Sequence, residues 1–212
     1  MTRVGSGMPT AQLTRRDQQG GGLSVEFLRT QGCYGHRIIG LGQDDATAVL
    51  LESIEGISRP PWPESPALQG LNVDDLQQHD SDSPGQQPSA MLIGMAADGH
   101  WSLSIEPLKI EGVCGFLFDV ACRVKTCPAS LTSTYRLAES VVLEDPGEQL
   151  QLENPIGRFT VVPLPVESDR DFDSDACRLL VGRSGIQLAR ETQWSDEAPT
   201  TLRWKYEIRM IN

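Results

Sequence analysis

One segment, Met91–Glu106, constrains the fold of this chain more than any other. Its sequence, MLIGMAADGHWSLSIE, holds two apolar runs separated by Asp98-Gly99. An Asp-Gly pair suits a two-residue type I′ turn, because aspartate and above all glycine tolerate the positive φ that both central residues need. The segment therefore predicts a β-hairpin whose register places Leu92 opposite Ile105.

This register divides the hairpin into two faces, since directly opposed residues of paired strands share a face. The apolar face is expected to join the core, and it carries Leu92, Ala96, Trp101, Leu103 and Ile105. The second face is mixed, and it carries Ile93, Met95, Ser102 and Ser104, with His100 beside the turn. We expect the second face to be partly covered, and Ser102 and Ser104 are candidate ligand-binding residues on it.

Short alternating segments recur in the rest of the chain. Apolar and polar residues alternate over residues 116–124 and again over residues 202–210. This period of two is typical of half-buried strands. About ten such strands, separated by turn residues and without a long amphipathic helix, predict an all-β, mainly antiparallel fold. Both a β-sandwich and a partly open β-barrel fit this pattern.

Three stretches depart from this alternation of apolar and polar residues. Residues 1–22 are polar and end in three glycines, so we expect a flexible arm before a single β domain over residues 23–212. Residues 44–55 fit either a helix or a strand, and their short length and β-branched residues favour the strand. Residues 59–89 are rich in proline and polar residues, which predicts a long irregular surface excursion, partly disordered.

Charge and cysteine content limit the partners and the compartment. The chain has 29 acidic and 18 basic residues, a net charge of −11, and such a field repels the phosphates of nucleic acids. The sequence contains neither an export signal nor a run of apolar residues long enough for a membrane span, so we expect a cytoplasmic protein. The odd number of cysteines, five, favours reduced thiols over a disulfide framework.

Four residues are candidates for catalysis. Cys33 and His36 are three residues apart, which fits a thiol–imidazole pair but also a loop cysteine beside a turn. His100 and Asp119 are the other titratable candidates for a site assembled from distant loops. Asp119 and Arg123 share one face of an apolar strand, so they are recognition groups if that face is concave and solvated charges if it is open.

One stretch has the spacing of a metal-binding loop. Carboxylates occur at every second position, at Asp169, Asp171, Asp173 and Asp175. Oxygen ligands at this spacing can surround Ca²⁺, but the glycine and glutamate of an EF-hand loop are missing, and a solvated loop is the alternative. No other cofactor is predicted.

Three functions remain open on this basis. The first is a non-enzymatic binding module that recognises a protein or a small polar ligand through one sheet face or the loops at one end. The second is a hydrolase-type enzyme, and the third is a structural or assembly subunit that forms homo-oligomers. A deep pocket with convergent titratable groups would favour the enzyme, an exposed apolar patch the partner module, and a large symmetric interface the assembly subunit.

Overall fold

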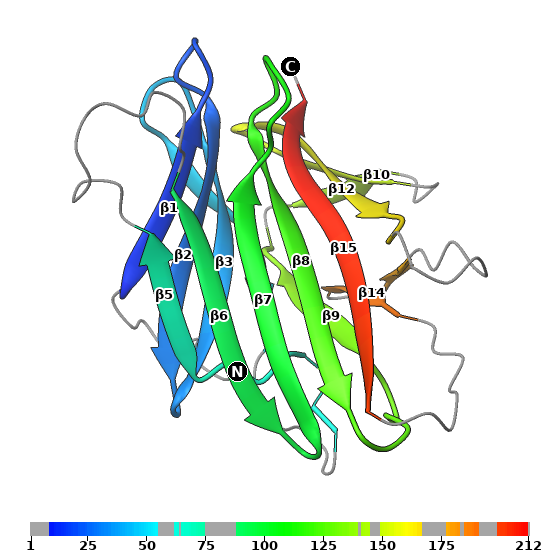
Figure 1. The fold of residues 1–212 in the computed structure, drawn as a ribbon. Coiled ribbons are helices and arrows are strands. Elements are labelled where there is room, and N and C mark those ends of the chain that lie inside the picture. Colours follow the sequence, from blue (N-terminus) through cyan, green and yellow to red (C-terminus); the bar gives the residue numbers. More distant parts are fainter. Residues whose placement is uncertain are drawn as a thin grey trace.

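The fold consists of two antiparallel β-sheets. The structure is a computed structural model that describes residues 9–54, 62–63, 65–74, 88–139, 141–144, 149–166, 177–182, 185–190 and 199–211. Within these ranges fifteen strands form one seven-stranded and one eight-stranded sheet, and Figure 1 shows them as two layers. The predicted all-β fold is confirmed, with more strands than expected, and the sheets form a sandwich rather than a closed barrel.

The seven-stranded sheet has the order β1-β2-β3-β4-β9-β14-β13. Its strands are β1 (Ala11–Arg16), β2 (Gly22–Thr30), β3 (Cys33–Leu41), β4 (Thr47–Ser53), β9 (Thr132–Leu137), β14 (Gly185–Ala189) and β13 (Arg178–Val181). The eight-stranded sheet has the order β10-β11-β12-β15-β8-β7-β6-β5. Its strands are β10 (Val142–Glu144), β11 (Leu150–Asn154), β12 (Gly157–Leu164), β15 (Thr200–Ile211), β8 (Gly115–Val124), β7 (Gly99–Pro107), β6 (Ser89–Ala96) and β5 (Gly70–Asp74).

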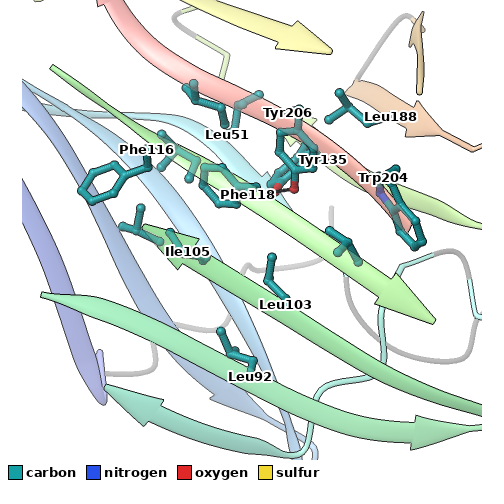
Figure 2. Packing of buried hydrophobic residues seen from close by; sticks show 14 of the residues in the cluster. Leu51, Leu92, Leu103, Ile105, Phe116, Phe118, Tyr135, Leu188, Trp204 and Tyr206 are labelled. Carbon is teal, nitrogen blue, oxygen red and sulfur yellow. Dashed lines mark hydrogen bonds between the residues drawn. The ribbon is translucent and has the colours of Figure 1, made fainter. Parts of the chain in front are cut away.

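The core fills the space between the sheets. One hydrophobic cluster joins inner side chains of both sheets, including Leu51 and Leu188 from the first and Leu103 and Phe118 from the second (Figure 2). The sheets approach closely where β3 faces β12. A Cβ at Gly40 would lie 2.8 Å from the Phe159 ring, so only glycine leaves room for that ring.

The hairpin of β6 and β7 confirms the predicted faces but corrects the predicted register. Its two-residue loop is Ala97-Asp98, and Leu92 lies opposite Leu103 instead of Ile105. The shift changes each partner by two positions. Because side chains alternate with a period of two, every residue stays on its predicted face.

Close packing accounts for the glycine at position 99, which lies on β7 and not in the loop. A Cβ at Gly99 would lie 2.9 Å from Cys122 Sγ and 3.1 Å from the ring of Trp62, so the glycine is required by close contacts rather than by its φ. Ala97 takes the positive φ of the turn, 52°. The Asp-Gly signal thus found the hairpin but not the position of its turn.

The prediction of a flexible arm over residues 1–22 is wrong for residues 11–16. These residues form β1, which pairs with β2 along its whole length. Leu13 is 1% exposed and is the buried anchor of the strand. An edge strand with one buried side chain has too little apolar periodicity to be recognised in the sequence. Residues 1–8 lie outside the described ranges.

Residues 44–55 contain β4, so the strand interpretation is confirmed. The ladder with β3 is interrupted by an irregularity between Ile38 and Ile39. Leu50 and Leu51 are consecutive and yet both fully buried. A bulge accounts for this, because it changes the alternation of side chains along the strand.

The described residues of the stretch 59–89 include buried side chains and a strand. Trp62 and Leu68 are buried, at 7% and 2% exposure, and β5 adds a strand at the edge of the eight-stranded sheet. The expectation of an irregular excursion is therefore wrong for residues 70–74. Residues 75–87 lie outside the described part of the chain.

Candidate functional site

The outer face of the eight-stranded sheet collects most of the predicted site residues. His100, Ser102 and Ser104 point outward from β7, and Asp119 and Arg123 point outward from β8, because their inward-facing neighbours are buried in the core. The register places His100 opposite Arg123 and Ser104 opposite Asp119. The structure therefore brings these five residues onto one surface, which we call the outer face.

Three apolar side chains lie on the same face along β6. Met91, Ile93 and Met95 are 46%, 59% and 61% exposed, and we call them the apolar row. Small residues flank its centre, since Ile93 lies opposite Gly70 on β5 and opposite Ser102 on β7. We predicted partial cover for this face, but the described residues leave the apolar row open.

The chain fixes the edge of the sheet beside the apolar row. The Gln69 side chain donates to the Met95 carbonyl at 2.9 Å and accepts from the Met95 amide at 2.7 Å. The Gln69 amide also donates to the Ile93 carbonyl at 2.8 Å. Gln69 directly precedes β5, and its hydrogen bonds satisfy backbone groups of β6 that β5 does not reach. They hold in place the part of β6 that carries Ile93 and Met95.

A cationic patch lies on the neighbouring strands β8 and β15 and contains Arg123, Arg203 and Lys205. Asp119 is a carboxylate partner of this patch: it accepts hydrogen bonds from two nitrogens of Arg203, one at 2.6 Å, and lies 3.3 Å from Lys205 Nζ. The hydrogen bonds to Asp119 raise the pKa of the Arg203 guanidinium above its ordinary value. This patch is a local positive region on a chain with a net charge of −11.

The four candidates for catalysis are not brought together. Cys33 and His36 are three positions apart on β3, so they point to opposite faces of their sheet, and the predicted thiol–imidazole pair does not form. His36 lies in the core with 6% exposure. His100 and Asp119 lie on the outer face of the other sheet, and Asp119 is held by Arg203.

Polar residues inside the sandwich form a second cluster, which sequence reasoning missed. Hydrogen bonds join the side chains of His36 and Tyr135 and those of Tyr135 and Tyr206, and Trp204 Nε1 donates to Ser133 Oγ, so both groups link the two sheets. Burial lowers the pKa of His36 from 6.5 to about 4 and raises the pKa of Tyr135 well above its ordinary value. The sequence contains one indication of this cluster: in the alternation of each strand, these residues fall at positions whose side chains point into the core.

A cleft of about 390 Å³ lies between the loop that joins β1 to β2 and the loop that joins β7 to β8. Arg15, Arg16, Asp17 and Glu111 contribute its charged groups, two of each sign. Arg16 is already bonded to two backbone carbonyls and to the Asp45 carboxylate. The cleft is therefore electrically balanced by the protein itself.

Metal and thiol chemistry receive little support from the described residues. The predicted Ca²⁺ ligands, Asp169, Asp171, Asp173 and Asp175, lie outside the described ranges, and no group of metal-ligating side chains occurs within them. All five thiols are free. Burial raises the pKa of Cys122 to about 12 and that of Cys177 to about 11, which leaves both thiols protonated at neutral pH.

Fold and surface together define the class of this protein: an antiparallel two-sheet β-sandwich with an apolar row and a cationic patch on one open face. No protein-family model, curated protein or solved structure matches the chain. Among the residues that the structure describes, no helix has the length and apolarity needed to cross a membrane.

Proposed function

We propose that this protein is a non-enzymatic binding module that recognises a partner protein through its outer face. The observation that carries the proposal is the exposure of the apolar row, whose three side chains are adjacent on one strand and 46% to 61% exposed. Contiguous exposed apolar side chains mark interaction sites more often than isolated ones do. Two of the three are methionines, whose flexible and polarizable side chains adapt to a partner surface.

The cationic patch defines the chemistry of the partner. Arg123, Arg203 and Lys205 carry three positive charges around the carboxylate of Asp119. A partner that covers the apolar row and this patch together would present apolar side chains next to carboxylates. The remaining surface of an acidic chain repels such a partner, so the patch orients it toward the outer face.

The dimensions of the outer face fit a protein rather than a small ligand. Ile93 and Arg203 lie in one row across the sheet, separated by Ser102 and Ala121 on the two strands between them. Three strand spacings amount to roughly 14 Å. A surface of this width suits a protein interface, in which each side buries about 800 Å².

The arrangement of the titratable groups favours recognition over catalysis. Asp119 is held in place by two cations, and His36 points into the core, away from His100. General acid–base and nucleophilic catalysis need such groups within hydrogen-bond reach of one another or of one substrate atom. On the outer face the titratable side chains belong to a surface that has apolar side chains on β6 and charged side chains on β8 and β15.

Site-specific cross-linking followed by binding of the purified partner tests the proposal. A photoreactive amino acid at position 93 is compared with one at position 180, because Leu180 is also exposed, at 49%, but lies on β13 of the other sheet. Proteins captured only at position 93 are identified, produced in pure form and titrated with the wild-type chain.

We expect Ile93→Asp to weaken this binding at least about tenfold, equivalent to about 1.4 kcal/mol. Leu180→Asp should leave the affinity unchanged. Arg123→Glu should slow association and reduce its dependence on salt. Equal capture at both positions, or wild-type affinity of Ile93→Asp, contradicts the proposal. Cross-links between two copies of this chain would instead identify an assembly subunit.

A further inference from the structure

Two of the three side chains in the apolar row are thioethers. Met91 and Met95 are 46% and 61% exposed, and they lie two positions before and after Ile93 on the same face of β6. The chain has five methionines, of which Met1 and Met8 lie outside the described residues. The apolar row therefore contains two side chains that are both apolar and open to oxidation.

The remaining methionine is enclosed by the protein. Met210 on β15 is partly buried and packs against the hydrophobic core. A Cβ at Gly21 would lie 3.1 Å from the terminal methyl carbon of Met210, and a Cβ at Gly157 would lie 3.3 Å from it. Because the end of the Met210 side chain lies against the backbone at both glycines, an oxidant in solution reaches the apolar row more readily.

Polar side chains stand beside both exposed thioethers. Met91 lies opposite Asn72 on β5 and opposite Ser104 on β7, and Met95 lies opposite His100. Directly opposed residues have Cβ atoms about 4.5–5.5 Å apart, so these polar groups are within reach of an oxygen atom added to either sulfur. Amide and hydroxyl groups can donate a hydrogen bond to such an oxygen. The free outer face therefore accommodates the sulfoxide form of both methionines.

We propose that Met91 and Met95 form an oxidation site that controls the apolar row, with a peroxide as the oxidant; this inference rests on the proposed function. The thioether sulfur attacks one oxygen of hydrogen peroxide, so an S–O bond forms and the O–O bond breaks. The sulfur loses two electrons and becomes a sulfoxide. The proton of the transferred oxygen passes to the leaving oxygen, which departs as water. A thiol reductant reverses the step: it removes the sulfoxide oxygen as water and is itself oxidised to a disulfide.

Oxidation changes the polarity of the apolar row but not the charge of the outer face. A partner that covers the row must bury the sulfoxide oxygen, which is costly unless hydrogen bonds replace those to solvent. The sulfoxide is neutral, so the cationic patch keeps its charge. Oxidation should therefore speed up dissociation of the partner and leave the salt dependence of its association unchanged.

The first test needs no partner. Purified wild-type chain is treated with dilute hydrogen peroxide, and tandem mass spectrometry follows the sulfoxide at each methionine. We expect Met91 and Met95 to be oxidised several-fold faster than Met210, and the oxidised chain to elute earlier from a hydrophobic-interaction column. Oxidation of Met210 at the same rate, or unchanged retention after oxidation of the other two, overturns the inference.

The second test uses the partner captured at position 93. Oxidised wild-type chain should bind it at least about tenfold more weakly, equivalent to about 1.4 kcal/mol, and a methionine sulfoxide reductase with its thiol reductant should restore binding. In Met91→Leu/Met95→Leu, peroxide should leave the affinity at its value before treatment, because leucine is apolar but is not oxidised. This variant keeps all five cysteines, so it separates oxidation of the methionines from oxidation of the thiols. Met210→Leu should respond to peroxide as the wild type does.

The two tests separate failure of the oxidation site from failure of the proposed function. A partner that binds oxidised and reduced wild-type chain equally overturns the oxidation site and leaves the proposed function in place. A double variant that loses as much affinity after peroxide as the wild type also overturns the oxidation site. Lack of selective capture at position 93 contradicts the proposed function, and the first test then still decides whether Met91 and Met95 are the sites of oxidation.

Discussion

The two faces of the eight-stranded sheet are built from the same strands and yet differ in what they hold. On β7, the inward side chains of Trp101, Leu103 and Ile105 are at most 2% exposed. On the neighbouring β6, the outward side chains of Ile93 and Met95 are 59% and 61% exposed. Alternation along each strand therefore separates the groups that hold the two sheets together from the groups that are available to a partner.

This difference has an energetic consequence. Inner side chains contact the opposite sheet, so removing one leaves a cavity or an unpaired polar group in a close-packed interior. Outer side chains border on solvent, so removing one changes the surface but hardly the folding free energy. Substitutions on the two faces should therefore separate stability from recognition.

The largest expected effect comes from a matched pair of leucines. Leu103→Ala on the inner face should lower the free energy of unfolding by about 2–5 kcal/mol, because the interior relaxes only partly around the cavity. Leu117→Ala on the outer face of β8 should cost less than about 1 kcal/mol. Urea unfolding of both variants gives the comparison, and equal losses would refute the separation of the faces.

Acid should destabilise the inner side through His36. The unfolded chain takes up a proton near pH 6.5, but the folded chain does so only near pH 4, so the unfolded state binds more protons in between. Stability should be complete above about pH 6.5 and should decrease by about 3 kcal/mol as the pH falls to about 4.

Urea titrations at several pH values measure this dependence. The variant His36→Gln is the control, because it removes the titrating ring and should flatten the stability curve over the same pH window. If the wild type and the variant show the same slope, His36 is not the group responsible.

Removing one hydroxyl from the buried cluster of His36, Tyr135 and Tyr206 should have a smaller effect. Tyr135→Phe removes the hydroxyl that lies 2.5 Å from Tyr206 Oη and 2.7 Å from His36 Nε2, so both buried groups lose a hydrogen-bond partner, which should cost about 1–3 kcal/mol. Tyr34→Phe is the matched control, since Tyr34 is half-buried near His36 and belongs to neither of these hydrogen bonds. Calorimetric unfolding of both variants checks the difference, and similar melting temperatures would argue against a stabilising role of the cluster.

The smallest change in stability is expected on the outer face. Asp119→Asn removes the carboxylate between Arg203 and Lys205, and ion pairs at the protein surface contribute about 0–1 kcal/mol. The same substitution increases the positive charge of the cationic patch, so binding of an acidic partner should become tighter. A loss of stability comparable to that of Leu103→Ala would show that the outer face also holds the fold together.

Much of the fold could be predicted because its signals are local. Alternation of apolar and polar residues identified β7, β8 and β15, and it placed every residue of the predicted hairpin on the correct face. The edge strands β1 and β5 were missed because they bury few side chains. β1 forms in a polar stretch because its backbone pairs with β2 and because the Leu13 side chain is buried in the core.

The site residues were predicted less completely. His100, Ser102, Ser104, Asp119 and Arg123 share one face, as their positions in neighbouring strands implied. The partners of Asp119 could not be named, because Arg203 and Lys205 lie about 85 positions further along the chain and meet it only across the β8–β15 ladder. His36 was taken for a loop or catalytic residue, although it occupies the inward phase of β3.

The sequence by itself determined the all-β class and the separation of inner and outer side chains, because the two-residue period of a strand is a property of consecutive residues. Only the tertiary structure decided which strands become neighbours, that the apolar row stays open, and that His36, Tyr135 and Tyr206 meet in the core. These features depend on pairing and packing between distant segments. Periodicity along the chain carries no information about which distant segment lies opposite.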